Sequence, residues 1–187
     1  KLVADLLTTA GVNRVVTVDL HAAQIQGFFD IPVDEMQALP LLIKYFRKKK
    51  VQDLCVVSPD HGSVARARTF AQYLDSPIAI VDKRRPKDNV SEVMNIIGDV
   101  RDKNLIILDD MIDTAGTLCA GAEVLLKNGA RSIVACATHP VLSGPAIDRI
   151  NSTEALSQVF VTDTIPLGDK LERCPKLTVI SVAAILG

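Results

Sequence analysis

The amino-acid sequence predicts an α/β fold in which a mainly parallel sheet is flanked by helices. Apolar segments of strand length alternate with helical patterns along most of the chain. The run at 105–108 is apolar without interruption, as expected for a strand that is buried on both faces. Hydrophobic residues make up 48% of the sequence but aromatic residues only 4%, which favours an aliphatic α/β core over an aromatic-rich β sandwich.

The elements before residue 82 follow from periodicity and turn residues. A helix is expected at 2–9, where apolar residues recur with helical spacing, and a strand at 14–19 follows the turn at Gly11. Pro32 argues against a helix at 31–33, so an extended connector is expected there. The next expected elements are a helix at 39–49 with a basic C-terminal turn, a strand at 54–58, a helix at 64–74 and a strand at 78–81.

The second half of the chain continues this alternation. An apolar segment at 93–97 precedes the strand at 105–108, and a helix at 117–128 ends at Asn128-Gly129, a frequent C-terminal signal. The remaining expected elements are a strand at 132–138, a short helix through residue 150, and strands at 159–162 and near 177–181. Because the loops near Asp60, Asp113 and His139 all follow strands, we expect them to gather at one edge of the sheet.

Composition and charge narrow the class of protein. The net charge of −1 gives no global field for nucleic acid or a membrane surface, and the basic residues at 47–50 are interpreted as a solvated helix end. Four cysteines without a CxxC pair predict reduced, buried thiols. No signal peptide or membrane-spanning run is visible, so a soluble cytoplasmic protein is expected. The chain begins inside a helical pattern and ends in an apolar segment, which predicts a fragment of a longer protein.

The stretch after the strand at 105–108 is the strongest candidate site. Asp109 and Asp110 follow the apolar run directly, and Thr114, Gly116 and Thr117 then lead into a helix, whose N-terminal amides can bind phosphate. Adjacent carboxylates repel an anion but suit hydroxyls or a cation, so the combination predicts a sugar phosphate. Separately, carboxylates that end a strand and a threonine that caps a helix are commonplace. Their occurrence in one continuous stretch favours function.

Three further segments are weaker candidates when considered alone. Asp60 and Gly62 lie in a strand–helix loop that suits a cation or an anion, although an ordinary turn explains them equally well. His21 follows the strand at 14–19, but a lone histidine is more often structural. A run of charged residues such as 82–89 usually forms a solvated loop, and the alternative is a mobile arm that neutralises phosphoryl oxygens.

Taken together, these motifs resemble one enzyme family. Residues 106–117, Ile-Ile-Leu-Asp-Asp-Met-Ile-Asp-Thr-Ala-Gly-Thr, are similar to the phosphoribosyl diphosphate (PRPP) motif of the type I phosphoribosyltransferase fold. Residues 19–32, Asp-Leu-His-Ala-Ala-Gln-Ile-Gln-Gly-Phe-Phe-Asp-Ile-Pro, are similar to a signature of ribose-phosphate diphosphokinases, or PRPP synthetases, of the bacterial class I type. The segments 58–62, 82–86 and 138–145 belong to the same enzymes in the same order, so the resemblance covers essentially the whole chain.

The resemblance implies a reaction and roles for individual residues. The family transfers the β,γ-diphosphoryl group of ATP to the 1-hydroxyl of ribose 5-phosphate, forming PRPP and AMP for nucleotide biosynthesis. By this resemblance Asp109 and Asp110 hold ribose hydroxyls, and Lys83 and Arg85 are catalytic cations that clamp the transferring group. The remaining implied site residues are those for the 5-phosphate (Asp113, Thr114, Ala115, Gly116, Thr117), the diphosphate loop (Asp60, His61, Gly62) and Mg²⁺ (His21, Asp60).

The resemblance also implies an organisation beyond this chain. Residues 1–35 correspond to the closing part of a first phosphoribosyltransferase-like domain, and 36–187 to a second domain that carries the ribose 5-phosphate site. The part that supplies adenine contacts is missing, so the chain as given is expected to be incomplete as an enzyme. A homo-oligomer, commonly a hexamer assembled from dimers, is implied, with phosphate and ADP as effectors. Ser63 departs from the family pattern, in which many members have a second glycine after Gly62.

Two other functions remain as alternatives. A phosphoribosyltransferase that consumes PRPP with a nucleobase shares the motif at 109–117 but does not need the segment 19–32 or the cations at Lys83 and Arg85. A non-catalytic associated subunit or PRPP-sensing regulator would be favoured by loss of His21 or of those cations, all of which are present. The synthetase is therefore the preferred hypothesis.

Overall fold

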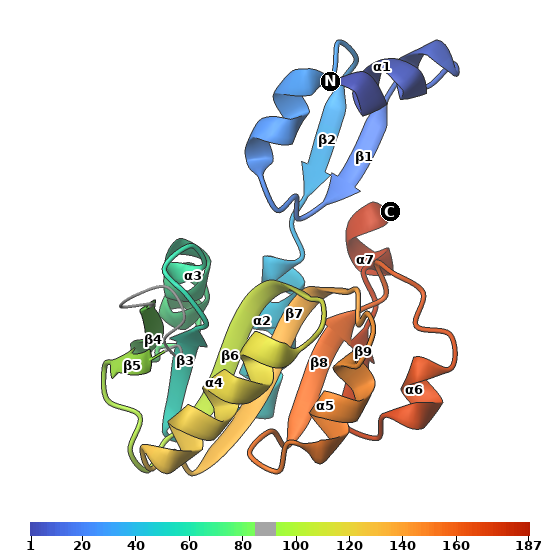
Figure 1. Cartoon of the computed structure of the whole chain (residues 1–187). Helices are drawn as coiled ribbons and strands as arrows, with labels where there is room; N and C mark the ends of the chain where they lie inside the picture. The colour runs from blue at the N-terminus through green and yellow to red at the C-terminus, as the bar shows by residue number, and fades with distance from the viewer. Residues whose placement is uncertain (85–92) are drawn as a thin grey trace.

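The computed structural model describes residues 1–84 and 93–187, which form two sheets surrounded by helices (Figure 1). The larger sheet has seven strands in the order β5-β4-β3-β6-β7-β8-β9, and the smaller sheet pairs β1 with β2. Neighbouring strands are parallel throughout, except for the antiparallel pair β4 and β5. The predicted α/β class with a mainly parallel sheet is confirmed.

The elements have the following bounds. The strands are β1 (Val15–Val18), β2 (Val33–Met36), β3 (Leu54–Ser58), β4 (Ile78–Arg84), β5 (Val93–Ile97), β6 (Asn104–Ile112), β7 (Ser132–Pro140), β8 (Gln158–Thr162) and β9 (Leu177–Ile180). The helices are α1 (Leu2–Thr9), the 3-10 helix η1 (Ala23–Phe28), α2 (Leu39–Lys49), α3 (Val64–Tyr73), α4 (Gly116–Lys127), α5 (Ala146–Ser152), α6 (Lys170–Arg173) and α7 (Ala183–Leu186). Within the described ranges no helix is long and apolar enough to cross a membrane.

The central strand β6 has two buried faces because helices cover the large sheet on both sides. Leu105 and Ile107 point into a core formed with α4 and α5, whereas Ile106 and Leu108 point into a core formed with α2 and α3. Figure 1 shows α4 and α5 in front of the sheet and α2 behind it. Side chains alternate across a strand, so an unbroken apolar run is what two covered faces require.

Several strands are longer than the sequence predicted. β6 continues to Ile112, so Asp109 and Asp110 lie inside the strand rather than after it. β4 continues to Arg84 and pairs with β5, so the charged segment begins within a strand and not, as predicted, as a solvated loop after residue 81. In each case backbone pairing with a neighbouring strand extends the element past the end of its apolar run.

The N-terminal residues form a separate lobe above the carboxyl edge of the large sheet (Figure 1). Its strand β2 was predicted only as an extended connector, but it pairs with β1 in parallel register, Val15 opposite Val33. The short helices η1, α6 and α7 were not predicted either. A four-residue strand with two acidic residues carries little periodic signal, so its partner strand decides its structure. The domain boundary expected near residue 35 stays a prediction.

Replacing Phe70 by Ala is expected to lower the free energy of unfolding by about 3–5 kcal/mol. The Phe70 ring is fully buried and packs edge-on against Phe46, with 5.8 Å between ring centroids. Urea unfolding followed by circular dichroism measures the change. Tyr73→Ala on the same helix is the matched control, because that side chain is 54% exposed, and its effect should stay within about 0.5 kcal/mol. Equal losses for both variants would contradict this account of the core.

Candidate functional site

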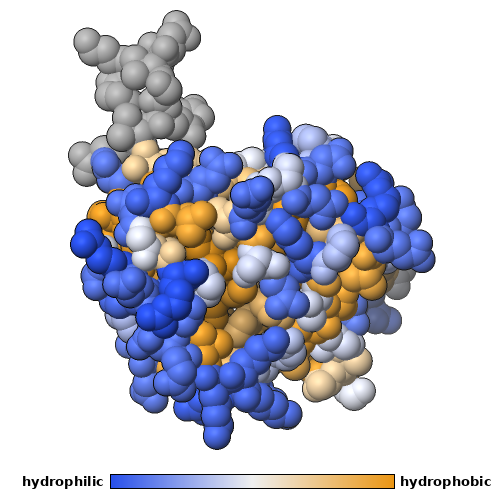
Figure 2. Space-filling model, turned by 90° about the horizontal axis from the view of Figure 1, so that it is seen from below, coloured by the Kyte–Doolittle hydropathy of each residue, from blue (hydrophilic) through white to orange (hydrophobic). Residues whose placement is uncertain are grey.

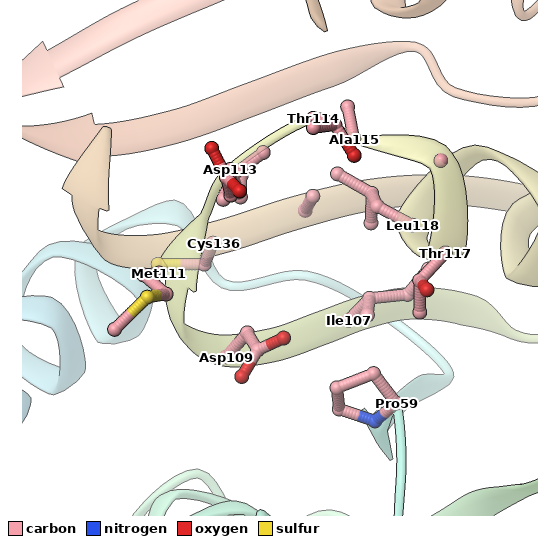
Figure 3. Close-up of a pocket in the computed structure, with 13 residues that line it drawn as sticks. Pro59, Ile107, Asp109, Met111, Asp113, Thr114, Ala115, Thr117, Leu118 and Cys136 are labelled. Carbon is pink, nitrogen blue, oxygen red and sulfur yellow. The ribbon is translucent and has the colours of Figure 1, made fainter. Parts of the chain in front are cut away.

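The carboxyl end of β6 borders a pocket of about 140 Å³. Its lining comes mainly from residues 109 and 111–118, together with Pro59 of the loop after β3 and Cys136 of β7. Figure 3 shows the side chains of Asp109, Asp113 and Thr117 around this space. Most of the segment predicted as a sugar phosphate site therefore lines this pocket, whereas Asp110 does not line it and contacts His21 instead.

The turn between β6 and α4 presents backbone amides to this pocket. Ala115 has the left-handed backbone angle φ 58°, and α4 begins directly afterwards at Gly116. No side chain caps the start of α4. The N–H groups in the first turn of a helix lack partners within the helix and carry partial positive charge, so they are available to an anion.

The loop after β7 and the helix α5 hold this turn in place. Arg149 Nη1 donates to the carbonyl oxygen of Thr114 at 3.0 Å, and the Ser143 hydroxyl donates to the Asp113 carboxylate. Backbone bonds from Leu142 to Ile112 and from Ser143 to Asp113 tie the same two segments together. An alanine Cβ at Gly116 would lie 3.2 Å from Arg149 Nη1, so this position favours glycine beside the guanidinium. Sequence reasoning did not identify Arg149, which has no motif of its own.

The carboxylate pair at 109–110 lies against His21 of the N-terminal lobe. His21 Nδ1 is 2.5 Å from Asp110 Oδ2, which joins residues 89 positions apart in the sequence. The hydrogen bond and charge of Asp110 raise the pKa of His21. Burial disfavours the charged form of Asp110, but its hydrogen bonds with His21 and Asp109 outweigh burial and lower its pKa. The structure thus brings together two residues that the sequence had placed in different domains.

Asp109 is the more buried of the two carboxyl groups. Burial raises its pKa to about 6, and the neighbouring charges of Asp110 and Asp60 act in the same direction. Asp109 Oδ1 accepts hydrogen bonds from the Asp110 amide at 2.9 Å and from the Ser63 hydroxyl at 3.3 Å. At neutral pH the two ionised carboxylates exceed the charge of a protonated His21. The cluster therefore carries net negative charge, which suits hydroxyl donors or a cation.

The loop between β3 and α3 borders the same cluster. The Asp60 carboxylate accepts a hydrogen bond from the Ser63 amide at 2.9 Å, and His61 Nε2 is 2.8 Å from Asp82 Oδ1 on β4. The ideal Cβ position on Gly62 would be 3.4 Å from Asp60 Oδ1, an ordinary contact. Ser63, noted only as a departure from the family pattern, links this loop to Asp109. This link depends on folding and has no signal in the sequence.

The two predicted catalytic cations lie at the limit of the described residues. The backbone of Lys83 is opposite Met94 in the pairing of β4 with β5, and its side chain is not among the parts that the structure describes. Arg85 lies outside the described residues altogether. Among the described residues, no group of three or more His, Cys, Asp and Glu side chains could by itself hold a metal ion.

A family model and curated relatives match this chain. A family model described as a phosphoribosyl synthetase-associated domain matches residues 85–187. The ribose-phosphate pyrophosphokinase of Oceanobacillus iheyensis is 56% identical over 187 residues, which are 100% of this chain and 58% of that protein. The protein of the same name from Caldanaerobacter subterraneus subsp. tengcongensis is 60% identical over 186 residues, 99% of this chain and 58% of that protein. The chain thus spans a little over half the length of these relatives.

Solved structures with similar folds agree with these relatives. The crystal structure of phosphoribosylpyrophosphate synthetase from Mycobacterium smegmatis has a TM-score of 0.88 and 46% sequence identity, covering 99% of this chain and 60% of that one. Orotate phosphoribosyltransferase from Aeropyrum pernix, at 18% identity and a TM-score of 0.52 over 80% of this chain and 72% of that one, shares the fold. The predicted phosphoribosyltransferase-like fold is confirmed.

Proposed function

The chain belongs to the phosphoribosyl pyrophosphate synthetase family, and we propose that this protein transfers the diphosphoryl group of ATP to the 1-hydroxyl of ribose 5-phosphate, giving PRPP and AMP. One observation carries the proposal. Asp109 lines one pocket with the uncapped start of α4, and His21 of the other lobe contacts the neighbouring carboxylate of Asp110.

The pocket suits ribose 5-phosphate because it separates two kinds of polar group. The amides at the start of α4, with the hydroxyls of Thr114 and Thr117, suit the 5-phosphate. Asp109 and Asp110, earlier along β6, suit the ribose hydroxyls, since an ionised carboxylate only accepts hydrogen bonds. We assign Asp113 to the phosphate turn, where its carboxylate accepts a hydrogen bond from the Ser143 hydroxyl.

The donor set fits Mg²⁺ as a cofactor that is shared with the substrate. Asp60 and the pair at 109–110 all act on His21 electrostatically, so negative charge converges there. Magnesium commonly takes only one or two protein carboxylates and completes its shell with phosphates and water, so a cluster of three protein ligands is not required. His21 and Asp60 are the residues proposed to hold it. When bound, the ion would neutralise charge on the polyphosphate oxygens.

In this proposal the diphosphoryl group is bound by the β3–α3 loop and by the cations Lys83, at the end of β4, and Arg85, which follows that strand in the sequence. Asp60, His61 and Gly62 form the loop that would receive the diphosphate, and its backbone is held by the contacts to Asp60 and Asp82. Lys83 and Arg85, by family resemblance, would neutralise the charge that develops during transfer. In this scheme the acceptor hydroxyl is mainly oriented by the protein.

Membership of this family supports three further proposals, which concern location, assembly and regulation. These proposals rest on the family to which the chain belongs. We propose a cytoplasmic location, a homo-oligomer (a hexamer assembled from dimers) and regulation by phosphate and ADP. Sedimentation analysis of the complete protein tests the oligomer, and activity titrations with phosphate and ADP test the effectors.

The decisive assay supplies the complete protein with ATP, Mg²⁺ and ribose 5-phosphate. We expect AMP and PRPP to appear in equal amounts, and omission of ribose 5-phosphate should abolish AMP formation. A parallel reaction with PRPP and each nucleobase tests the phosphoribosyltransferase alternative. Formation of a nucleotide from a nucleobase, without AMP formation from ATP, would overturn the proposal. The contact between His21 and Asp110 favours the synthetase, because a simple phosphoribosyltransferase does not need it.

Replacing Arg149 by Ala is expected to weaken binding of ribose 5-phosphate about tenfold, the loss expected for one hydrogen bond that orders the phosphate turn. The change removes the contact from Nη1 to the carbonyl of Thr114 while it leaves the turn's own sequence intact. Calorimetric titration with ribose 5-phosphate measures the dissociation constant. Arg173→Ala is the control, since Arg173 only pairs with Asp169 on the surface. An unchanged affinity in Arg149→Ala would remove Arg149 from the account of this site.

A further inference from the structure

We propose that Asp19 is a positioning residue which, with Arg66 and Thr138, fixes His21 over Asp110. This inference rests on the proposed function, because it assigns the cluster a purpose in that reaction. It concerns the point at which the N-terminal lobe meets the large sheet, where the backbone passes from β1 to His21. Figure 1 shows the lobe joined to the large sheet by the chain that runs from the end of β2 into α2.

The Asp19 side chain is buried and surrounded by hydrogen-bond donors. Only 6% of the residue is exposed. One carboxylate oxygen, Oδ2, accepts from Arg66 Nη2 at 2.5 Å and from Thr138 Oγ1 at 2.5 Å. The other, Oδ1, accepts from the Ala38 amide at the start of α2 at 3.2 Å. Arg66 Nη2 also contacts Thr138 Oγ1 at 2.7 Å, so the three side chains form a closed triangle.

The backbone of Asp19 is held as firmly as its side chain. Its amide donates to the carbonyl of Met36 at 2.9 Å, and its carbonyl accepts from His139 Nε2, also at 2.9 Å. Because a carbonyl only accepts, His139 Nε2 carries a proton, and Nδ1 faces the Thr164 hydroxyl at 3.0 Å. Every polar atom of Asp19 thus has a partner within the protein, which leaves it suited to positioning rather than to contact with substrate.

The conformation of Asp19 explains why so many contacts converge on it. Its φ of 43° lies in the left-handed region, which is unfavourable for a residue other than glycine. Such a conformation persists where surrounding contacts over-determine it. Here it redirects the chain at the end of β1, and Glu35 of β2 holds the following residue by accepting from the Leu20 amide at 3.2 Å. The backbone is therefore restrained on both sides immediately before His21.

His21 itself has little packing to hold it. Its side chain is 73% exposed, and its contact with Asp110 is its one hydrogen bond within the described residues. β7, which carries Thr138 and His139, pairs directly with β6, where Asp109 is opposite Ala137 and Met111 is opposite His139. The Asp19 cluster is therefore built on the strand beside the carboxylate pair. Loosening it should shift His21 relative to Asp110 without touching either residue.

A double-mutant cycle in the complete protein tests this role. Thr138→Val removes the hydroxyl that contacts Asp19 with little change in volume. In the native background we expect kcat/KM for ATP to fall about tenfold, since small displacements of a positioned group cost substantial rate. In a His21→Ala background the same change should cost less than about twofold, because non-additivity is the sign of a shared effect. Equal fold losses in both backgrounds would overturn the proposal.

Two further comparisons keep the test independent of folding and of activity. Thr178→Val is the matched control: the Thr178 hydroxyl accepts from Gln158 Nε2 at 2.7 Å, and these two residues lie on β9 and β8, outside the Asp19 cluster. It should leave the rate near the native value. Arg66→Lys is the second variant if Thr138→Val does not fold, and the same cycle applies to it.

Hydrogen–deuterium exchange of a peptide that covers residues 19–22 gives the readout without catalysis. We expect faster exchange in Thr138→Val than in the native protein or in Thr178→Val. Unchanged exchange in Thr138→Val would contradict the positioning role even in a protein with normal activity. Absence of AMP formation by the native protein would instead count against the proposed function, so the two failures can be told apart.

Discussion

Replacement of both Lys83 and Arg85 by Ala is expected to lower kcat for PRPP formation by about 10³-fold or more, within the range found for cations that stabilise phosphoryl transfer. Charge builds up on the transferring group, and a cation that acts only in the transition state changes kcat rather than ground-state affinity. Binding of ribose 5-phosphate should therefore be nearly unchanged. Steady-state kinetics with ATP and ribose 5-phosphate, together with calorimetry for the sugar phosphate, measure both quantities.

The prediction for these cations depends on their place in the sequence. They follow Asp82 in the sequence. Asp82 is a buried residue of β4, and His61 from the proposed diphosphate loop contacts its carboxylate. Arg131→Ala provides a control for the loss of positive charge, because Arg131 pairs with Asp53 at the opposite edge of the sheet. A kcat near the native value in the double variant of Lys83 and Arg85 would refute their catalytic role.

Asp110→Asn is expected to weaken ribose 5-phosphate binding by about 10- to 100-fold, the range for a hydrogen bond to a charged group. ATP should be affected far less. The native carboxylate is ionised at neutral pH, because its hydrogen bonds with His21 and Asp109 lower its pKa despite burial. The amide keeps the shape but offers one acceptor in place of two charged oxygens. Calorimetric titrations with each ligand measure the two affinities.

The same variant makes a prediction about pH that does not involve a ligand. Asp110 raises the pKa of His21 above its ordinary value of 6.5, so removal of the charge should bring that pKa down. Less His21 would then be protonated at neutral pH, as NMR titration of the imidazole would detect. Asp99→Asn is the control, since Asp99 is an exposed carboxylate that pairs with Lys103 before the start of β6, whereas Asp110 lies near the other end of that strand. Equal weakening of ATP and ribose 5-phosphate in Asp110→Asn would contradict the sugar assignment.

The sequence was most informative where the structure is local. The pocket wall at 109 and 111–117 is a strand end, a turn and a helix start that follow one another in the chain, so its residue types and spacing could be interpreted together. The apolar run before it also predicted a strand with two covered faces, as found. The exact end of that strand was predicted wrongly, because apolar character stops at Leu108 while pairing with β7 continues to Ile112.

Contacts across long sequence separations left no comparable signal. Neither β2 nor the link between Ser63 and Asp109 was predicted, since a short strand or a single hydroxyl has no periodicity to detect. The pairing of His21 with Asp110 joins residues that had been assigned to separate domains. Each of these depends on which surfaces meet after folding, and the identities of the residues alone do not determine that.

By itself the sequence determined the α/β class, the aliphatic core and the candidate sugar phosphate motif, because apolar periodicity and turn chemistry act over a few neighbouring residues. The tertiary structure decided how the N-terminal lobe meets that motif. Asp19, in a strained backbone conformation and bonded to Arg66 and Thr138, anchors the lobe beside the carboxylate pair. Arg66 on α3 and Thr138 on β7 are 47 and 119 residues away from Asp19 along the chain. Only the folded arrangement of α3, β7 and the N-terminal lobe brings them within hydrogen-bond distance of Asp19.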